Sequence, residues 1–224
     1  MTKETYKLIE SYMKSCMSDS AHDTEHIYRV LYNALNIAGS EKDVDFDILI
    51  CACLLHDIGR QDQFENPALC HAQVGGDKAY DFLVQNGFST DFALRVKSCI
   101  VTHRFRKNNP PESVEAKILF DADKLDVTGA LGIARTLIYK GQVAEPLYTI
   151  LPNGQIDDGQ SSSPSFFNEY RYKLEKIYGT FYTSYGKKLA EERRKHAEQF
   201  FLELKAEITC SRTGGQKLLD NVLK

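Results

Sequence analysis

The sequence predicts an all-α protein, and three observations support that fold class. Apolar residues recur at intervals of three and four along most of the 224-residue chain. Strict alternation of apolar and polar residues, the pattern of a half-buried strand, is scarce. The apolar segment 46–55 is rich in leucine and alanine, and its length and composition favour a central helix over a buried strand. We therefore expect a single helical bundle.

The first strong helical signal begins after residue 20. Ser20 and Asp23 have the spacing of a capping box, with Asp in place of the usual Glu or Gln. One apolar helix face follows, made of Ile27, Val30, Leu31, Ala34, Leu35 and Ala38. Gly39 ends this helix. The next predicted helix, 46–55, continues into His56 and Asp57, and we expect Gly59 to be its C-cap.

Helical spacing continues through the rest of the chain. Further helices are expected at 71–86, 90–105, 112–127, 165–178 and 181–208. The longest loop, 150–165, is the best candidate for a mobile segment. These elements predict one domain over residues 1–208, with the C-terminal helices packed on it and a flexible tail at 209–224.

Charge and composition exclude several classes of protein. The net charge of −3 argues against a general nucleic-acid binder, which normally carries a strongly basic domain. The sequence contains neither a long apolar run of membrane-spanning type nor an N-terminal signal segment, so we expect a cytoplasmic protein without membrane contact. The six cysteines form no CxxC pair, which is typical of buried thiols in a reducing compartment.

Residues of metal-ligand type occur on three helices whose other faces are apolar. They are His26, the adjacent pair His56 and Asp57, and Asp123. Buried imidazoles and carboxylates need a partner, because loss of their hydration is otherwise costly. Two imidazoles and two carboxylates suit a divalent cation of intermediate hardness and leave coordination positions for water and substrate. Such a centre is suited to hydrolysis of phosphate esters.

This set resembles the H…HD…D motif of the HD-domain superfamily of metal-dependent phosphohydrolases. The flanking segments 23–30, 54–59 and 118–130 share the resemblance, which extends over about residues 20–205. Within the superfamily the chain is similar to a small stand-alone bacterial branch described as YpgQ-like, whose members are nucleotide pyrophosphohydrolases. The resemblance implies an HD-domain helical bundle.

The resemblance also assigns the metal ligands and the catalytic residues. It implies that His26, His56, Asp57 and Asp123 bind one divalent ion, and that the last three of them are the catalytic residues. Mn²⁺ is the expected ion, with Mg²⁺, Fe²⁺, Co²⁺, Ni²⁺ and Zn²⁺ as alternatives, because the residue types do not select among them.

Three aspartates share the predicted helix around residue 123. The family pattern places the ligand before a basic residue and a leucine, which selects Asp123. Asp126 lies one turn further along and is interpreted as a substrate contact or a support for a ligand. Asp121 is two residues from Asp123 and thus nearly on the opposite side of the helix, so we expect it to be exposed or capping.

Basic side chains near the motif are candidates for binding phosphate. Arg29 lies three residues after His26, Arg60 follows the HD turn, and Lys124 adjoins Asp123. For Arg29 and Lys124, neutralisation of nearby carboxylates is an equally good interpretation. Some HD nucleotidases carry a glutamate at the position of Arg60 that acts as an acid or base, and that role does not transfer to this chain.

Two further histidines remain to be assigned. We interpret His71 and His103 as substrate contacts, while a second-metal role and a structural role stay open. Binuclear relatives usually carry a further adjacent histidine that this sequence lacks, which favours one metal.

The resemblance implies hydrolysis of nucleoside or deoxynucleoside triphosphates to monophosphate and pyrophosphate. Water activated by the cation would attack phosphorus directly, without a covalent enzyme intermediate. The alternatives are a phosphomonoesterase or phosphodiesterase acting on another nucleotide, and a nucleotide-binding sensor without catalysis. The expected partner is a nucleotide or another small phosphate ester. A homodimer stays open.

Overall fold

The computed structural model describes residues 1–17, 24–104 and 109–223, so the proposed capping box at Ser20 and Asp23 lies outside the described residues. Helices are the regular elements of the described ranges, together with one isolated antiparallel bridge between Ile150 and Ile156. The all-α, single-domain fold class is confirmed. Within it, contacts distinguish two compact units: a first unit of Met1–Asp126 and Phe181–Gly186, and a second unit of Val127–Thr180 and Lys187–Lys224.

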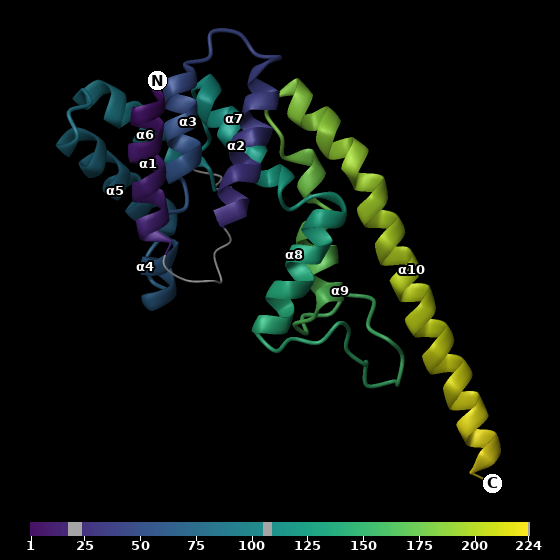
Figure 1. The fold of residues 1–224 in the computed structure, drawn as a ribbon. Coiled ribbons are helices and arrows are strands. Elements are labelled where there is room, and N and C mark those ends of the chain that lie inside the picture. Colours follow the sequence, from purple (N-terminus) through teal and green to yellow (C-terminus); the bar gives the residue numbers. More distant parts are fainter. Residues whose placement is uncertain (18–23, 105–108, 224) are drawn as a thin grey trace. The chain divides into compact units, whose positions relative to one another are not determined.

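The first unit is organised around a central apolar helix. Its helices are α1 (Lys3–Cys16), α2 (Thr24–Ala38), α3 (Phe46–Leu55), α4 (Arg60–Glu65), α5 (His71–Gln85), α6 (Thr90–Thr102) and α7 (Val114–Leu125). Helix α3 contacts α1, α2, α5, α6 and α7 (Figure 1). All of its residues from Cys51 to Leu55 are buried, so its cysteines are packing residues. The carboxylate of Asp45 begins the helix by accepting the backbone N–H groups of Asp47 and Ile48.

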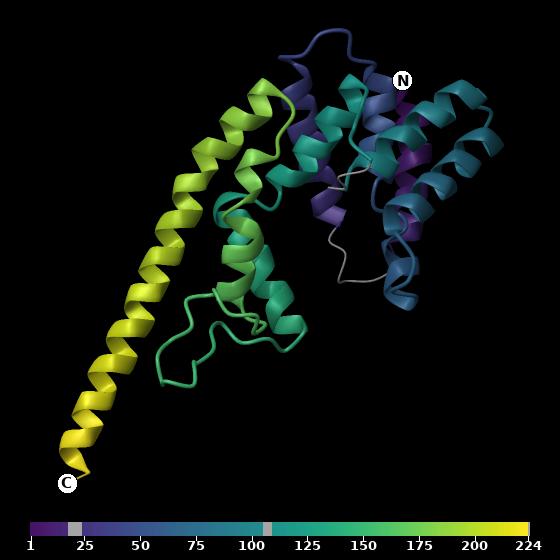
Figure 2. The same cartoon turned by 180° about the vertical axis from the view of Figure 1, so that it is seen from behind.

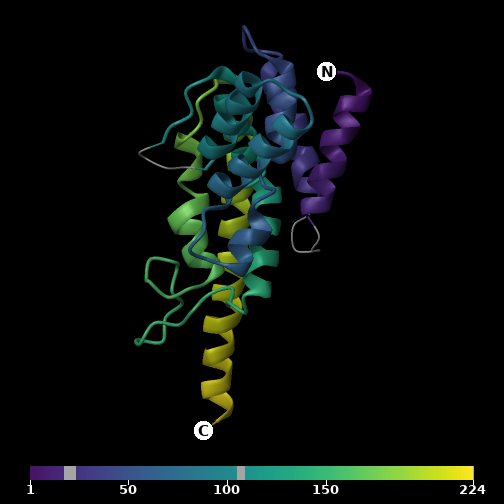
Figure 3. The same ribbon diagram turned by 90° about the vertical axis from the view of Figure 1, so that its left-hand side faces the viewer.

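Two helix pairs surround α3 and determine where the functional side chains lie. Helix α5 packs along α6, and α2 packs along α7 (Figure 2). Helix α1 packs on α3 at the edge of this unit (Figure 3) and buries only Ile9 and Met13. No helix is predicted from the sequence at α1, although Ile9, Tyr12, Met13 and Cys16 recur at intervals of three and four.

Gly59 has a different role from the one predicted. It is not the C-cap of α3, because α3 ends at Leu55 and a turn separates the two residues. A Cβ atom at Gly59 would lie 2.4 Å from His71 O and 2.6 Å from Gly75 N. The lack of a side chain therefore allows the HD turn to approach α5 closely, which brings His71 near the motif.

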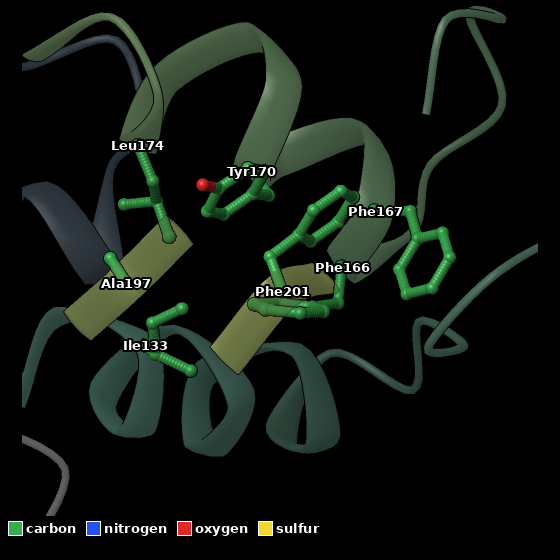
Figure 4. Close-up of a cluster of buried hydrophobic side chains, with 7 residues drawn as sticks. All are labelled: Ile133, Phe166, Phe167, Tyr170, Leu174, Ala197 and Phe201. Carbon is green, nitrogen blue, oxygen red and sulfur yellow. The ribbon is translucent and has the colours of Figure 1, made fainter. Parts of the chain in front are cut away.

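The second unit is built around aromatic side chains. It contains α8 (Gly129–Gln142), α9 (Phe166–Glu169), the π-helical segment η1 (Tyr170–Leu174), the 3-10 segment η2 (Ile177–Gly179) and all but the first three residues of α10 (Ser184–Val222). The Tyr170 ring stacks on Phe201 with 3.9 Å between centroids, and Phe167 meets Phe201 edge to face (Figure 4).

Several predicted boundaries in this unit differ from the structure. No helix is predicted from the sequence at α8. The single helix predicted at 165–178 is divided in the structure into α9, η1 and η2. The predicted end of the last helix at 208 is wrong, because α10 continues to Val222 with residues 209–222 exposed. Flexibility of 209–224 stays a prediction. Among the described residues, no helix is both long enough and apolar enough to cross a bilayer.

Candidate metal centre

Three helices of the first unit bring the four predicted metal ligands together. His26 lies in the first turn of α2, His56 and Asp57 directly follow α3, and Asp123 lies near the end of α7. His26 Nε2 is 3.4 Å from His56 Nε2 and 3.5 Å from both Asp123 Oδ1 and Asp57 Oδ2. We call His26, His56 and Asp123 the Oδ2 side of the centre, because both imidazoles face Asp57 Oδ2 and Asp123 lies beside them.

Hydrogen bonds fix the orientation of both imidazoles on the Oδ2 side. His56 donates its Nδ1–H to the Cys53 carbonyl at 2.8 Å, and His26 donates its Nδ1–H to Asp126 Oδ2 at 2.7 Å. Both acceptors can only accept, so the second ring nitrogen, Nε2, faces the centre in each case. This arrangement, a metal-ligand histidine backed through Nδ1, is what a divalent cation requires. The donor set therefore fits a divalent ion.

Asp126 also receives a guanidinium. Arg29 donates from Nε to Asp126 Oδ1 at 2.8 Å and from Nη2 to Asp126 Oδ2 at 3.1 Å. Asp126 is 0% exposed, whereas the Arg29 side chain is 30% exposed. The contacts of Arg29 thus match the interpretation in which it neutralises a carboxylate, and Asp126 lies directly behind a predicted metal ligand.

Two more histidines lie on the other oxygen of Asp57. His71 begins α5 and His103 follows the last residue of α6. Their Nε2 atoms are 3.5 and 3.6 Å from Asp57 Oδ1, and 3.3 Å from each other. His71 donates its Nδ1–H to Gln63 Oε1 at 2.6 Å, and His103 donates its Nδ1–H to the Ile100 carbonyl at 2.6 Å. We call His71 and His103 the Oδ1 side.

The remaining predicted residues are cations near these carboxylates. Arg60 Nε lies 2.9 Å from Asp57 Oδ1, yet both atoms are buried and neither has a hydrogen-bond partner among the described residues. Lys124 Nζ is 3.5 Å from Asp123 Oδ2 and 4.8 Å from the centroid of the Phe120 ring. The histidines of both sides and Arg60 therefore lie around the Asp57 carboxylate. Arg29 and Lys124 contact Asp126 and Asp123 instead.

The surroundings give these groups unequal proton affinities. Burial lowers the pKa of His26, but its hydrogen bonds to Asp126 and Asp57 outweigh this and raise it to about 9. Burial lowers the pKa of His56 to about 4, and burial together with the nearby Arg60 charge lowers that of His71 to about 3. Although burial opposes ionisation, cationic neighbours hold the pKa of Asp57 and Asp123 well below the ordinary value.

Comparison with known proteins identifies the family of this centre. Residues 24–128, which contain every one of these ligands, match the HD domain family model. Over 206 residues the chain is 32% identical to the protein YpgQ of Bacillus subtilis, an alignment that covers 89% of this chain and 92% of YpgQ. The chain belongs to the HD-domain superfamily.

Solved structures of the superfamily have the same fold over almost the whole chain. The structure of YpgQ in complex with ADP has a TM-score of 0.70 at 29% identity and covers 91% of this chain and 97% of that one. A predicted HD-superfamily hydrolase from an uncultured Thermotogales bacterium has a TM-score of 0.60 at 31% identity, covering 92% and 91%. An HD-superfamily hydrolase from Bacillus thuringiensis has a TM-score of 0.70 at 26% identity, covering 92% and 98%. Such relatives support a metal-dependent hydrolase.

One aspartate near the HD motif is placed differently from its prediction. Asp121 is 0% exposed, so the expectation of exposure is wrong. Its carboxylate accepts the backbone N–H groups of Tyr182 and Thr183 at 2.9 and 2.7 Å, and the Thr183 hydroxyl at 2.6 Å. These donors directly precede α10, and the Thr183 hydroxyl in turn accepts the Gly186 N–H in the first turn of that helix. Asp121 therefore holds the residue that caps α10.

Sequence reasoning missed two features of the HD centre. Gln63, which orients His71, carries no recognisable signal, because glutamine in a short polar helix is usually exposed. The division of the donors between the two oxygens of Asp57 was missed as well. The number of histidines in 56–103 was the available hint, but only tertiary contacts show which oxygen each one faces.

Proposed function

We propose that this chain hydrolyses nucleoside or deoxynucleoside triphosphates to the monophosphate and pyrophosphate, with Mn²⁺ as its ion. The observation that carries the proposal is the convergence of inward-facing imidazole nitrogens and carboxylate oxygens in a buried centre that also contains arginine and lysine. The complex of YpgQ with ADP supports a nucleotide as substrate. Free nucleoside triphosphates are cytoplasmic, and we expect the protein to act there.

His26, His56, Asp57 and Asp123 would hold the ion. When bound, a divalent cation lowers the pKa of a coordinated water and polarises a phosphoryl oxygen, which is the chemistry that phosphate ester hydrolysis needs. The residues of the chain prepare this centre. Asp126 and the Cys53 carbonyl hold the two rings so that both Nε2 atoms face inward. Burial excludes bulk water and so strengthens each charge interaction at the centre.

The basic and histidine side chains would bind the polyphosphate. The Arg60 side chain is 37% exposed, so its outer nitrogens can reach a phosphate while Nε stays at Asp57. Lys124 supplies a compact positive charge next to Asp123. His71 and His103 present Nε2 atoms at the same centre. Arg29 is oriented by Asp126 and exposes part of its guanidinium.

Isotope labelling tests the reaction directly. Protein stripped with chelator and reloaded with Mn²⁺ is incubated with ATP and dATP in ¹⁸O-water, and the products are analysed by mass spectrometry. We expect pyrophosphate and a nucleoside monophosphate that carries the ¹⁸O atom, as attack at the α-phosphorus requires. Release of inorganic phosphate from ATP would replace the proposal with a phosphomonoesterase. A cyclic dinucleotide is assayed in parallel, and its opening to the linear dinucleotide would replace the proposal with a phosphodiesterase. Nucleotide binding without turnover would make the protein a sensor.

A matched pair of variants ties the activity to the centre. Asp123→Ala removes a proposed metal ligand and should abolish turnover. His196→Ala removes an exposed imidazole in the middle of α10 and should leave turnover unchanged. Equal loss of activity in both variants would show that the loss does not report on the HD centre.

A further inference from the structure

The Oδ1 side has the features of a second cation site. The Nδ1–H groups of His71 and His103 are both used by oxygen acceptors, so the Nε2 atom of each ring faces the centre, and the two Nε2 atoms lie 3.3 Å apart. Both also face Asp57 Oδ1, a buried oxygen with no hydrogen-bond partner among the described residues. Two imidazole nitrogens and one carboxylate oxygen are a partial ligand set for a divalent ion.

A cation from the chain itself already lies at this position. Arg60 Nε is 2.9 Å from Asp57 Oδ1, on the same oxygen that His71 and His103 face. On the Oδ2 side the arginine and lysine side chains contact other carboxylates: Arg29 binds Asp126, and Lys124 Nζ lies 3.5 Å from Asp123 Oδ2. The two sides therefore differ in whether a guanidinium occupies the shared carboxylate oxygen.

We propose that Asp57 Oδ1, His71 and His103 form a second divalent-cation site that Arg60 keeps closed, so that the natural chain binds one ion and the chain without this guanidinium binds two. The inference rests on the proposed metal centre at His26, His56, Asp57 and Asp123. It adds to that centre the reason why a chain with six suitable donors holds a single ion.

Electrostatics explains how one side chain closes the site. A guanidinium and a divalent ion on the same oxygen repel each other strongly at a separation of a few ångströms, because little water screens them there. Arg60 can be substituted, because a second divalent ion would supply the positive charge that Asp57 loses. The arginine side chain is 37% exposed, and its contact with Asp57 lacks hydrogen-bond geometry, so its removal breaks no hydrogen bond at the centre. Arg60 is the first residue of α4, where alanine is well tolerated.

Metal stoichiometry tests the proposal. Full-length protein is stripped with chelator, equilibrated with Mn²⁺, desalted, and assayed by elemental analysis and electron paramagnetic resonance. We expect one ion per chain in the natural protein and two in Arg60→Ala. Two ions bridged by one carboxylate lie about 3.5–4 Å apart, so Arg60→Ala should give the spectrum of an exchange-coupled pair. The double variant Arg60→Ala with His103→Ala should return to one isolated ion.

Arg104→Ala is the matched control. Arg104 follows His103 and contacts Cys70 Sγ at 3.8 Å, so this variant removes a nearby positive charge without touching Asp57. It should bind one ion. Arg60→Gln, which keeps length and polarity but loses the charge, should also bind two ions and provides the same test if Arg60→Ala does not fold.

Each other outcome has a distinct meaning. One ion in both folded Arg60 variants, or two ions in the natural protein, overturns the closed-site inference and leaves the proposed function standing. Two ions in Arg104→Ala would show a general charge effect and would also overturn it. No ion in any variant would refute the proposed metal centre itself.

Discussion

The two sides of Asp57 use the same kinds of donor but have different surroundings. On the Oδ2 side, the ring of His26 is backed by a carboxylate, and its pKa is raised to about 9. On the Oδ1 side, the ring of His71 is backed by the neutral amide of Gln63, and its pKa is lowered to about 3. Burial lowers the pKa of His56 on the Oδ2 side as it does that of His71, so the two sides differ in the carboxylate behind His26 and in the guanidinium at Asp57 Oδ1.

This difference shows that donor identity alone does not define a metal site. The imidazoles of both sides present Nε2 to one carboxylate at similar distances. The charges behind and beside them decide which side attracts a cation most strongly. The predictions below test that distinction.

Removal of one ligand from each side should give the largest contrast. Asp123→Ala should lower turnover by more than about 100-fold, because changes that only misorient a ligand already cost about 10- to 100-fold. It should also abolish binding of the ion, with modest loss of folding stability. His103→Ala should retain the ion, as calorimetric titration with Mn²⁺ can measure. Loss of the ion in both variants would contradict the conclusion that the ion binds on the Oδ2 side of Asp57.

Substitution of the residues that accept the Nδ1–H groups of the histidines should have the next largest effect on metal affinity. Asp126→Asn removes the charge behind His26 and should weaken Mn²⁺ binding about 10- to 100-fold. Gln63→Ala makes the corresponding change behind His71 and should alter the affinity only a few-fold, because the ion lies on the other side of Asp57. Equal weakening in these two variants would mean that the sides act as one site.

Asp121 lies on the same helix as Asp123, but its substitution should lower folding stability and leave metal binding unchanged. Asp121→Asn should lower the free energy of unfolding by roughly 1–3 kcal/mol, because a buried carboxylate with three hydrogen-bond donors is replaced by an amide that cannot accept from all of them. Thermal melts measure this loss. The folded variant should bind Mn²⁺ with near-natural affinity, and a large loss of affinity would show that Asp121 belongs to the metal centre.

The pH dependence of the metal-free protein should be the smallest effect. His56 and His71 have folded pKa values of about 4 and 3, below the unfolded value near 6.5, so unfolding takes up protons as pH falls from 6.5 and stability decreases. The pKa of His26 is raised to about 9, so its contribution is complete below pH 6.5 and is lost as pH rises through 9. Urea unfolding with chelator should therefore show maximal stability near pH 6.5.

The variant His71→Ala is the control for this profile. It should flatten the acid limb between pH 6.5 and 4 and leave the alkaline limb unchanged. Stability that rises steadily from pH 6.5 to 9 would contradict the charge environment assigned to His26.

The strongly periodic helices were predictable because their apolar spacing is a local property. The segments that became α2, α3, α5, α6 and α7 were predicted with only small errors at their ends. Helices α1 and α8 were not predicted. Three glycines lower the helical propensity of α8, whereas α1 was missed although its apolar residues follow helical spacing. The family motif likewise identified His26, His56, Asp57 and Asp123 as ligand candidates.

The sequence by itself determined the helical class, the superfamily and these ligand candidates. Only the tertiary structure decided which oxygen of Asp57 each histidine faces, that Arg60 contacts that carboxylate, and that Asp121 is buried. Asp121 is the clearest case, because its partner Thr183 lies 62 residues away in the chain. Helical spacing reports which side of a helix a residue occupies, but what covers that side depends on contacts between distant segments, which no local pattern contains.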